Sequence, residues 1–121
     1  MYPRETVFAE KLEAITCLGM TNSRMKDYFD LLALAKEGAM DDDLLSAAVF
    51  ATFTRRGTVI PGRLPDGLTS RFANDQGKQT QWQAFLKKNS LQAPSLFNVV
   101  AELATFSRTP LARAAAMRSG D

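Results

Sequence analysis

Three charged residues near the start of the chain stand where apolar helix positions are expected. Lys11 and Arg24 each fall within an apolar set that is spaced for one helix face, and Asp27 stands at the margin of the second set. A charge on such a face is costly unless it is paired or borders a solvated cleft. Two compatible interpretations follow: a salt bridge of Lys11 or Arg24 with Asp27 that fastens the helices, or a site that binds an anionic ligand.

The first of these helices is expected between Pro3 and Gly19, because proline suits a first helical position and glycine suits the residue after the end. The acidic residues Glu10 and Glu13 are expected to point away from its apolar face. At about 100° per residue, that face comprises Val7, Phe8, Lys11, Ala14, Ile15 and Leu18.

The second helix is expected to be capped by Asn22 or Ser23 and followed by Gly38. Lys26 and Asp30 are assigned to its outer face. Its apolar arc comprises Met25, Tyr28, Leu31, Leu32 and Ala35.

The acidic run 41–43 would suit a metal ion, but a helix N-terminus is the favoured interpretation, since consecutive helical residues point different ways. The helix that it opens, 44–56, has apolar residues on nearly every side, so we expect it to be central and buried. Prolines and glycines then predict a loop. The whole is expected to be a single helical domain, 1–121, with a two-helix site hairpin 3–37, buried helix 41–56, loop 57–68 and helices 69–121.

The second half is expected to contain a short helix 70–74, a helix 79–88 and a long helix 95–107 that ends or kinks at Pro110. Trp82 and Phe85 would form either a platform for stacking bases or a core anchor, and their spacing favours the core. No segment alternates with period two for long enough to form a strand. The sequence therefore predicts an all-α, compact bundle of five or six helices.

Composition excludes several classes of chemistry. The 121 residues include no histidine and one cysteine, which removes histidine-based catalysis, an internal disulfide and a multi-cysteine zinc site. The net charge of +2 is too small to indicate nucleic acid by itself. No glycine-rich phosphate loop occurs. No apolar run suits a membrane span and no signal peptide is evident, so we expect a soluble, cytoplasmic protein.

The sequence resembles the abortive-infection nucleotidyltransferase toxins, the AbiEii/AbiGii family. The specific part is Y-P-R-E-T-V-F-A-E-K-L-E-A-I followed by N-S-R-M-K-D-Y-F-D-L, with a lysine, an arginine thirteen residues on and an aspartate three after it. The looser part runs through F-A-T-F-T-R-R-G-T-V-I-P and P-D-G-L-T-S-R-F-A-N-D to Q-W-Q-A-F-L-K-K.

This resemblance implies a toxin of a bacterial toxin–antitoxin system, active in abortive infection and phage defence. Such toxins have a polymerase-β-like fold and transfer nucleotides from a nucleoside triphosphate (NTP) to RNA, including tRNA, with Mg²⁺. Their helical C-terminal half supplies a lysine, an arginine and an aspartate. The resemblance carries these over to Lys11 and Asp27 as catalytic residues and to Lys11 and Arg24 as nucleotide-binding residues. Asn22 stands where the family pattern has a hydroxyl residue.

The family's N-terminal half, with its Gly-Ser loop and metal-binding aspartates, has no counterpart in this sequence. We therefore expect a truncated chain or one half of a split enzyme, inactive alone, with an N-terminal half or an antitoxin as possible partners. One alternative is a non-enzymatic helical module that binds RNA or a protein. Another is an inactive truncated remnant. The RNA-binding alternative would use the basic residues Arg55, Arg56, Arg63, Arg71, Lys87 and Lys88.

Overall fold

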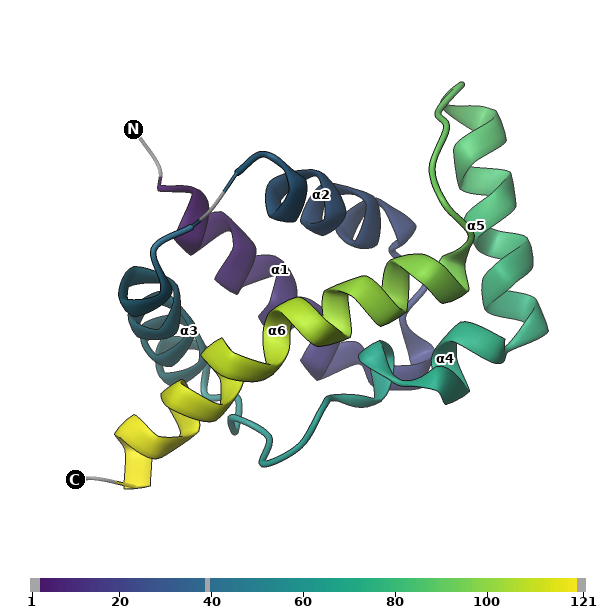
Figure 1. Ribbon diagram of the computed structural model, residues 1–121. Helices are drawn as coiled ribbons and strands as arrows, with labels where there is room; N and C mark the ends of the chain where they lie inside the picture. The colour runs from purple at the N-terminus through teal and green to yellow at the C-terminus, as the bar shows by residue number, and fades with distance from the viewer. Residues whose placement is uncertain (1–2, 39, 120–121) are drawn as a thin grey trace.

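The computed structural model describes residues 3–38 and 40–119, so the ends of the expected domain 1–121 lie outside the described residues. The described part is all-helical and contains no strand (Figure 1). The prediction of an all-α bundle is therefore confirmed. Its elements are α1 (Arg4–Leu18), the 3₁₀ turn η1 (Gly19–Thr21), α2 (Met25–Lys36), α3 (Asp42–Arg56), the 3₁₀ turn η2 (Asp66–Leu68), α4 (Ser70–Asn74), α5 (Gln76–Lys88) and α6 (Leu96–Ser119).

Helix α1 has the expected limits but a different buried face. It follows Pro3 and ends at Gly19, whose φ of 54° is a left-handed conformation that glycine adopts without strain. Phe8 and Ile15 are buried as expected, but the centre of the buried face lies about one position, or about 100°, further around the helix than predicted. The face that is buried comprises Phe8, Ala9, Leu12, Glu13 and Ile15. The expectation that Glu13 points away from the core is therefore also wrong.

Helix α2 begins at Met25, one residue later than a Ser23 cap would allow and two later than an Asn22 cap would. Arg24 is the residue that precedes its first turn, and the Arg24 backbone N–H donates to Asn22 Oδ1 at 2.8 Å. Asn22 thus orders the turn before the helix and does not cap the helix itself. The predicted apolar arc is confirmed, with Met25, Tyr28, Leu31 and Leu32 buried.

Helix α3 is opened by Asp41, whose side chain accepts a hydrogen bond from the Leu44 N–H at 2.9 Å. The capping interpretation of the acidic run is confirmed. The helix ends at Gly57, at a φ of 70°. It is not buried all round, because Leu44 is 59% exposed and only the face that contains Val49 and Phe53 is covered. The other side carries mostly small or polar side chains and tolerates water.

Helix α5 begins at Gln76, three residues earlier than predicted, because Asp75 caps it and accepts a hydrogen bond from the Lys78 N–H at 3.0 Å. Trp82 is fully buried and its indole Nε1 donates to the Pro94 carbonyl at 3.0 Å. A buried, hydrogen-bonded indole is a core anchor, so the structure supports that interpretation over a base-stacking platform.

The prediction was that helix α6 ends or kinks at Pro110; the helix continues through this residue, so the predicted end is wrong and the kink stays a prediction. Proline removes one helical hydrogen bond and crowds the preceding turn. Beyond it, Leu111 and Ala114 are buried, and this burial favours continuing the helix. Figure 1 shows α6 crossing the molecule from α5 to α3, and it packs against both α2 and α3. None of the described helices is both long and apolar enough to cross a membrane.

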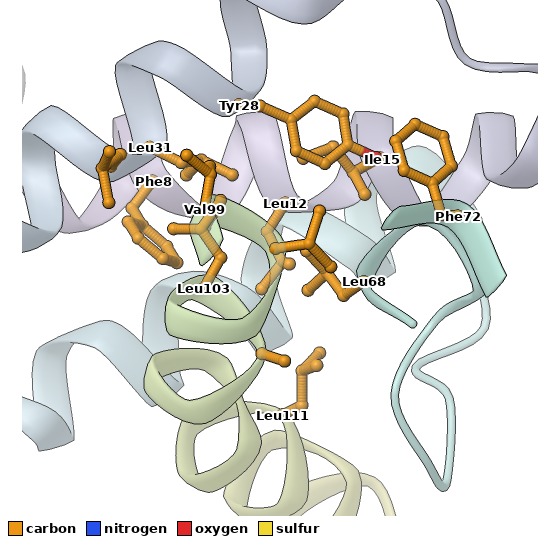
Figure 2. Close-up of a cluster of buried hydrophobic side chains, with 14 of the residues drawn as sticks. Phe8, Leu12, Ile15, Tyr28, Leu31, Leu68, Phe72, Val99, Leu103 and Leu111 are labelled. Atoms are coloured by element: carbon orange, nitrogen blue, oxygen red, sulfur yellow. The ribbon is translucent and has the colours of Figure 1, made fainter. Parts of the chain in front are cut away.

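The core gathers where α1, α2, α3, α4 and α6 meet. In Figure 2, Phe8 and Leu12 of α1 lie beside Val99 and Leu103 of α6. Phe8 also packs on Phe106, with ring centroids 5.1 Å apart. Together these contacts seat α6 over the buried face of α1.

A second part of the core joins α2 to the loop before α4. Tyr28 stacks on Phe72, with ring centroids 5.1 Å apart, and its hydroxyl donates to the Gly67 carbonyl at 2.8 Å. A Cβ at Gly67 would lie 2.7 Å from Ile15 Cγ2 and 2.8 Å from Tyr28 Oη. The loop therefore approaches the first two helices more closely than any residue with a side chain allows.

We expect Gly67→Ala to lower the free energy of unfolding by about 1–3 kcal/mol, because the added methyl group overpacks this contact. Urea denaturation checks the loss. Gly62→Ala is the matched control, since a Cβ there meets nothing within 4 Å. Equal stability of the two variants would contradict the close approach.

Candidate functional site

A cleft of about 470 Å³ lies along α1, between the start of α2 and the end of α3. Three helices contribute to it, and each brings at least one charge. Three of the lining residues are cations and two are carboxylates. The lining comprises Val7, Glu10, Lys11 and Ala14 from α1, Arg24 and Asp27 at the start of α2, and Arg56 at the end of α3.

Lys11 is held by two carboxylates of α2. Its Nζ lies 3.3 Å from Asp27 Oδ1 and 3.1 Å from Asp30 Oδ2. Asp30 also accepts a hydrogen bond from Lys26 at 2.6 Å. The assignment of Asp30 to an outer face away from the cluster is therefore wrong, because it reaches Lys11. Lys26 itself is exposed, as predicted.

Asp27 is the carboxylate beneath both cations. Its side chain is 4% exposed, and its Oδ2 lies 3.3 Å from Arg24 Nε. That approach is close enough for an ion pair, although Oδ2 makes no hydrogen bond. Arg24 remains 63% exposed at its side chain. The predicted salt bridge that fastens the two helices is confirmed for Lys11 and Asp27, whereas the Arg24–Asp27 pair lies at the start of α2. The role of these residues toward a ligand stays a prediction.

The charge states of the Lys11 cluster follow from its surroundings. Partial burial lowers the pKa of Lys11, but the Asp30 and Asp27 carboxylates outweigh burial and leave this pKa raised. Burial likewise raises the pKa of Asp30, but Lys26 and Lys11 more than offset it, so this pKa is lowered. Lys11 is therefore a cation and Asp30 an anion at neutral pH.

The opposite wall of the cleft contains a contact that sequence reasoning missed. Glu13 is buried and accepts hydrogen bonds from Arg56 Nη1 at 2.8 Å and from Thr58 Oγ1 at 2.6 Å. Arg56 also lies 3.9 Å from Glu10. The sequence did offer one signal, the R-R-G-T run at the end of α3, which places a cation and a hydroxyl at a helix terminus.

The described residues do not suit a metal ion. No three Asp, Glu or Cys side chains within 3–38 and 40–119 come together as a metal site would require. Asp41 is engaged as a helix cap, and Asp27 is occupied by Lys11 and Arg24. The cations suit anionic oxygens instead, since lysine and arginine are the residues that bind phosphate groups.

The six basic residues of the RNA-binding alternative are not brought together. Arg56 lines the cleft, whereas Arg63 lines a separate hollow on α6 and Lys88 another beside α5. Arg55 pairs with Glu10 at 3.5 Å. Arg56, Arg63 and Lys88 therefore line three different hollows and share no single site.

Fold and site together define a helical domain with a cleft of paired charges suited to a phosphate-bearing ligand. A family model described as "Nucleotidyl transferase AbiEii toxin, Type IV TA system" matches residues 1–110. The chain therefore belongs to the AbiEii nucleotidyltransferase toxin family. Membership implies an NTP and a metal as the family's general requirements and an antitoxin as partner. No curated protein and no solved structure matches the chain.

We expect Asp30→Asn to lower stability at pH 7 by about 0.5 kcal/mol, a small value because solvent screens the pair. A carboxylate whose pKa is lowered by folding stabilises above its unfolded pKa of about 4, and this contribution is lost as pH falls through the folded pKa. Urea denaturation at pH 7 and at about pH 2.5 should show the difference between variant and wild type vanish in acid. A difference that persists in acid would mean that packing, not charge, was lost.

Proposed function

We propose that this chain is the helical C-terminal part of a nucleotidyltransferase toxin that transfers nucleotides from an NTP to RNA, tRNA included. Two cations, Lys11 and Arg24, converge on the Asp27 carboxylate at one cleft of a chain in the AbiEii family. This convergence is the observation that carries the proposal.

Lys11 is assigned to the phosphates of the bound nucleotide. Its charge is secured by two carboxylates, and it lines the cleft rather than being enclosed. A fixed cation there offsets the negative charge that develops on the phosphoryl oxygens during transfer. Because Asp27 is nearly buried beneath it, we assign Asp27 to orienting Lys11 and to assisting the incoming hydroxyl group.

Arg24 is assigned to binding the nucleotide. It has one contact with Asp27 and a largely exposed side chain, so its guanidinium is accessible from the cleft. A guanidinium presents a planar set of donors that matches two phosphate oxygens at once. Asn22 holds the backbone of Arg24 in place, because its side-chain oxygen accepts a hydrogen bond from the Arg24 N–H.

The metal ion of the proposed reaction would bind to a part of the enzyme other than the described residues. In nucleotidyl transfer the metal ion neutralises phosphate charge and helps to activate the attacking hydroxyl. Since the described residues do not form a metal site, we propose that the Gly-Ser loop and metal-binding aspartates come from a catalytic half outside them. The same proposal places the enzyme in the cytoplasm, where NTP and tRNA occur, with a role in phage defence under the control of an antitoxin.

We expect Lys11→Ala, placed in the enzyme completed with its metal-bearing half, to lower nucleotide transfer by at least about 100-fold, because a transition-state cation is lost. The assay follows labelled NTP onto total tRNA with magnesium. Circular dichroism checks that the helical fold survives. Lys26→Ala is the matched control, since it removes the same charge and a contact to the same Asp30 from outside the cleft.

Transfer by Lys26→Ala should stay within about twofold of wild type, as expected for an exposed surface charge. A fully active Lys11→Ala enzyme would rule out the assigned role. Loss of transfer in both variants would mean that the charge balance of Asp30 matters, not contact of Lys11 with phosphate.

We expect Arg24→Ala to act mainly on binding, with KM for the NTP raised about tenfold and kcat changed much less. Arg24→Lys should recover part of the affinity, because it restores the charge but not the planar fork. Steady-state kinetics at varied NTP concentration separate the two constants. A fall in kcat at unchanged KM would assign Arg24 to the transition state instead.

A further inference from the structure

Glu13 is a buried carboxylate to which the proposed function assigns no role. It accepts hydrogen bonds from Arg56 and from Thr58, at 2.8 and 2.6 Å, and so links α1 to the end of α3. An apolar contact of similar size would fasten two helices equally well or better, because an ion pair loses its hydration when it is buried. Stability alone is therefore a weak explanation for an ion pair here.

The hydrogen bond between Glu13 and Arg56 also holds a cation at the cleft. The Arg56 side chain is 41% exposed and lines the same cleft as Lys11 and Arg24, but from the wall formed by α3. Two of the three cations of the cleft are thus tied to a carboxylate on a neighbouring helix, whereas Arg24 pairs with Asp27 three residues along the chain. Lys11 is tied to Asp27, and Arg56 to Glu13. Arg56 is held at the cleft although arginine is otherwise a long and flexible side chain.

We propose that Arg56 is a third phosphate-contacting residue of the cleft, and that Glu13 is the positioning residue that holds it there. The inference rests on the proposed function, which makes the ligand a phosphate compound. Lys11 and Arg24 approach that ligand from the α1 and α2 side, and Arg56 approaches from α3. The phosphate that Arg56 contacts belongs either to the NTP or to the backbone of the RNA that accepts the nucleotide.

The test measures binding of two probes by the full chain, ATP and a short unstructured RNA oligonucleotide. Arg56→Ala should weaken binding of at least one probe by about tenfold, the usual effect of losing a charged hydrogen bond. For the RNA, the slope of log K against log salt should become shallower by about 0.7, which corresponds to one phosphate contact on a single strand. Loss for ATP alone or for RNA alone identifies which phosphate is contacted.

Arg55→Ala is the matched comparison, because it removes the same charge one residue away, and with it a contact to the same Glu10, from a residue that does not itself line the cleft. Its effect measures the long-range contribution of one positive charge. Arg56→Ala also leaves Glu13 buried without its partner, so Glu13→Gln/Arg56→Ala is prepared alongside to keep the fold. Equal effects of the Arg55 and Arg56 variants on both probes would overturn the proposal, as would wild-type affinity in both Arg56 variants or a wild-type chain that binds neither probe.

The role of Glu13 has its own readout. Glu13→Gln should weaken probe binding when Arg56 is present and have no further effect in the Arg56→Ala background, since Glu13 acts through Arg56. Equal losses in both backgrounds would overturn the positioning role. Lys11→Ala is measured with the same probes. If it loses ATP while the Arg56 variants do not, only this inference fails; if Lys11→Ala binds ATP like wild type, the proposed function fails.

Discussion

Helices α2, α3 and α6 all pack against α1, and this packing decides where the charges of the cleft lie. The buried face of α1 is wide enough to include Glu13 as well as Phe8 and Leu12, so only one flank is left open to water. Lys11 and Glu13 stand on either side of that flank, too close to the core to remain unpaired. Each is neutralised by a neighbouring helix, Lys11 by α2 and Glu13 by α3. The cleft is the open flank between these two sets of ion pairs.

Local signals in the sequence were sufficient for most of the fold and for one wall of the site. Prolines, glycines and aspartates mark helix ends through backbone geometry that needs no distant partner, as Gly19, Asp41 and Gly57 show. The pairing of Lys11 with Asp27 was also predictable, because a short turn brings α2 back along α1. A lysine on one apolar face and an aspartate at the margin of the next then have few other partners.

The rest depended on elements far along the chain. Which face of α1 is buried is decided by α3 and α6, and hydrophobic spacing within α1 alone placed that face one residue too early. The same error hid Glu13, whose partner Arg56 is 43 residues away. Asp30 was misplaced because a long lysine side chain reached it from another helix. Helix α6 continues past Pro110, where Leu111 is buried. Such burial is a tertiary effect, which a rule based on helix propensity does not contain.

The two walls of the cleft pack mainly against α1 and α6, not against each other. Helix α6 leaves the ribosome after α1, α2 and α3, and every residue that lines the cleft lies between 7 and 56. During synthesis, the cations are therefore present before α6, one of the two helices that pack against both walls. A polypeptide that stopped before residue 96 would contain all of the cleft residues but would have only α1 to join the two walls. Order of synthesis thus sets the moment at which the walls of the cleft gain their second supporting helix.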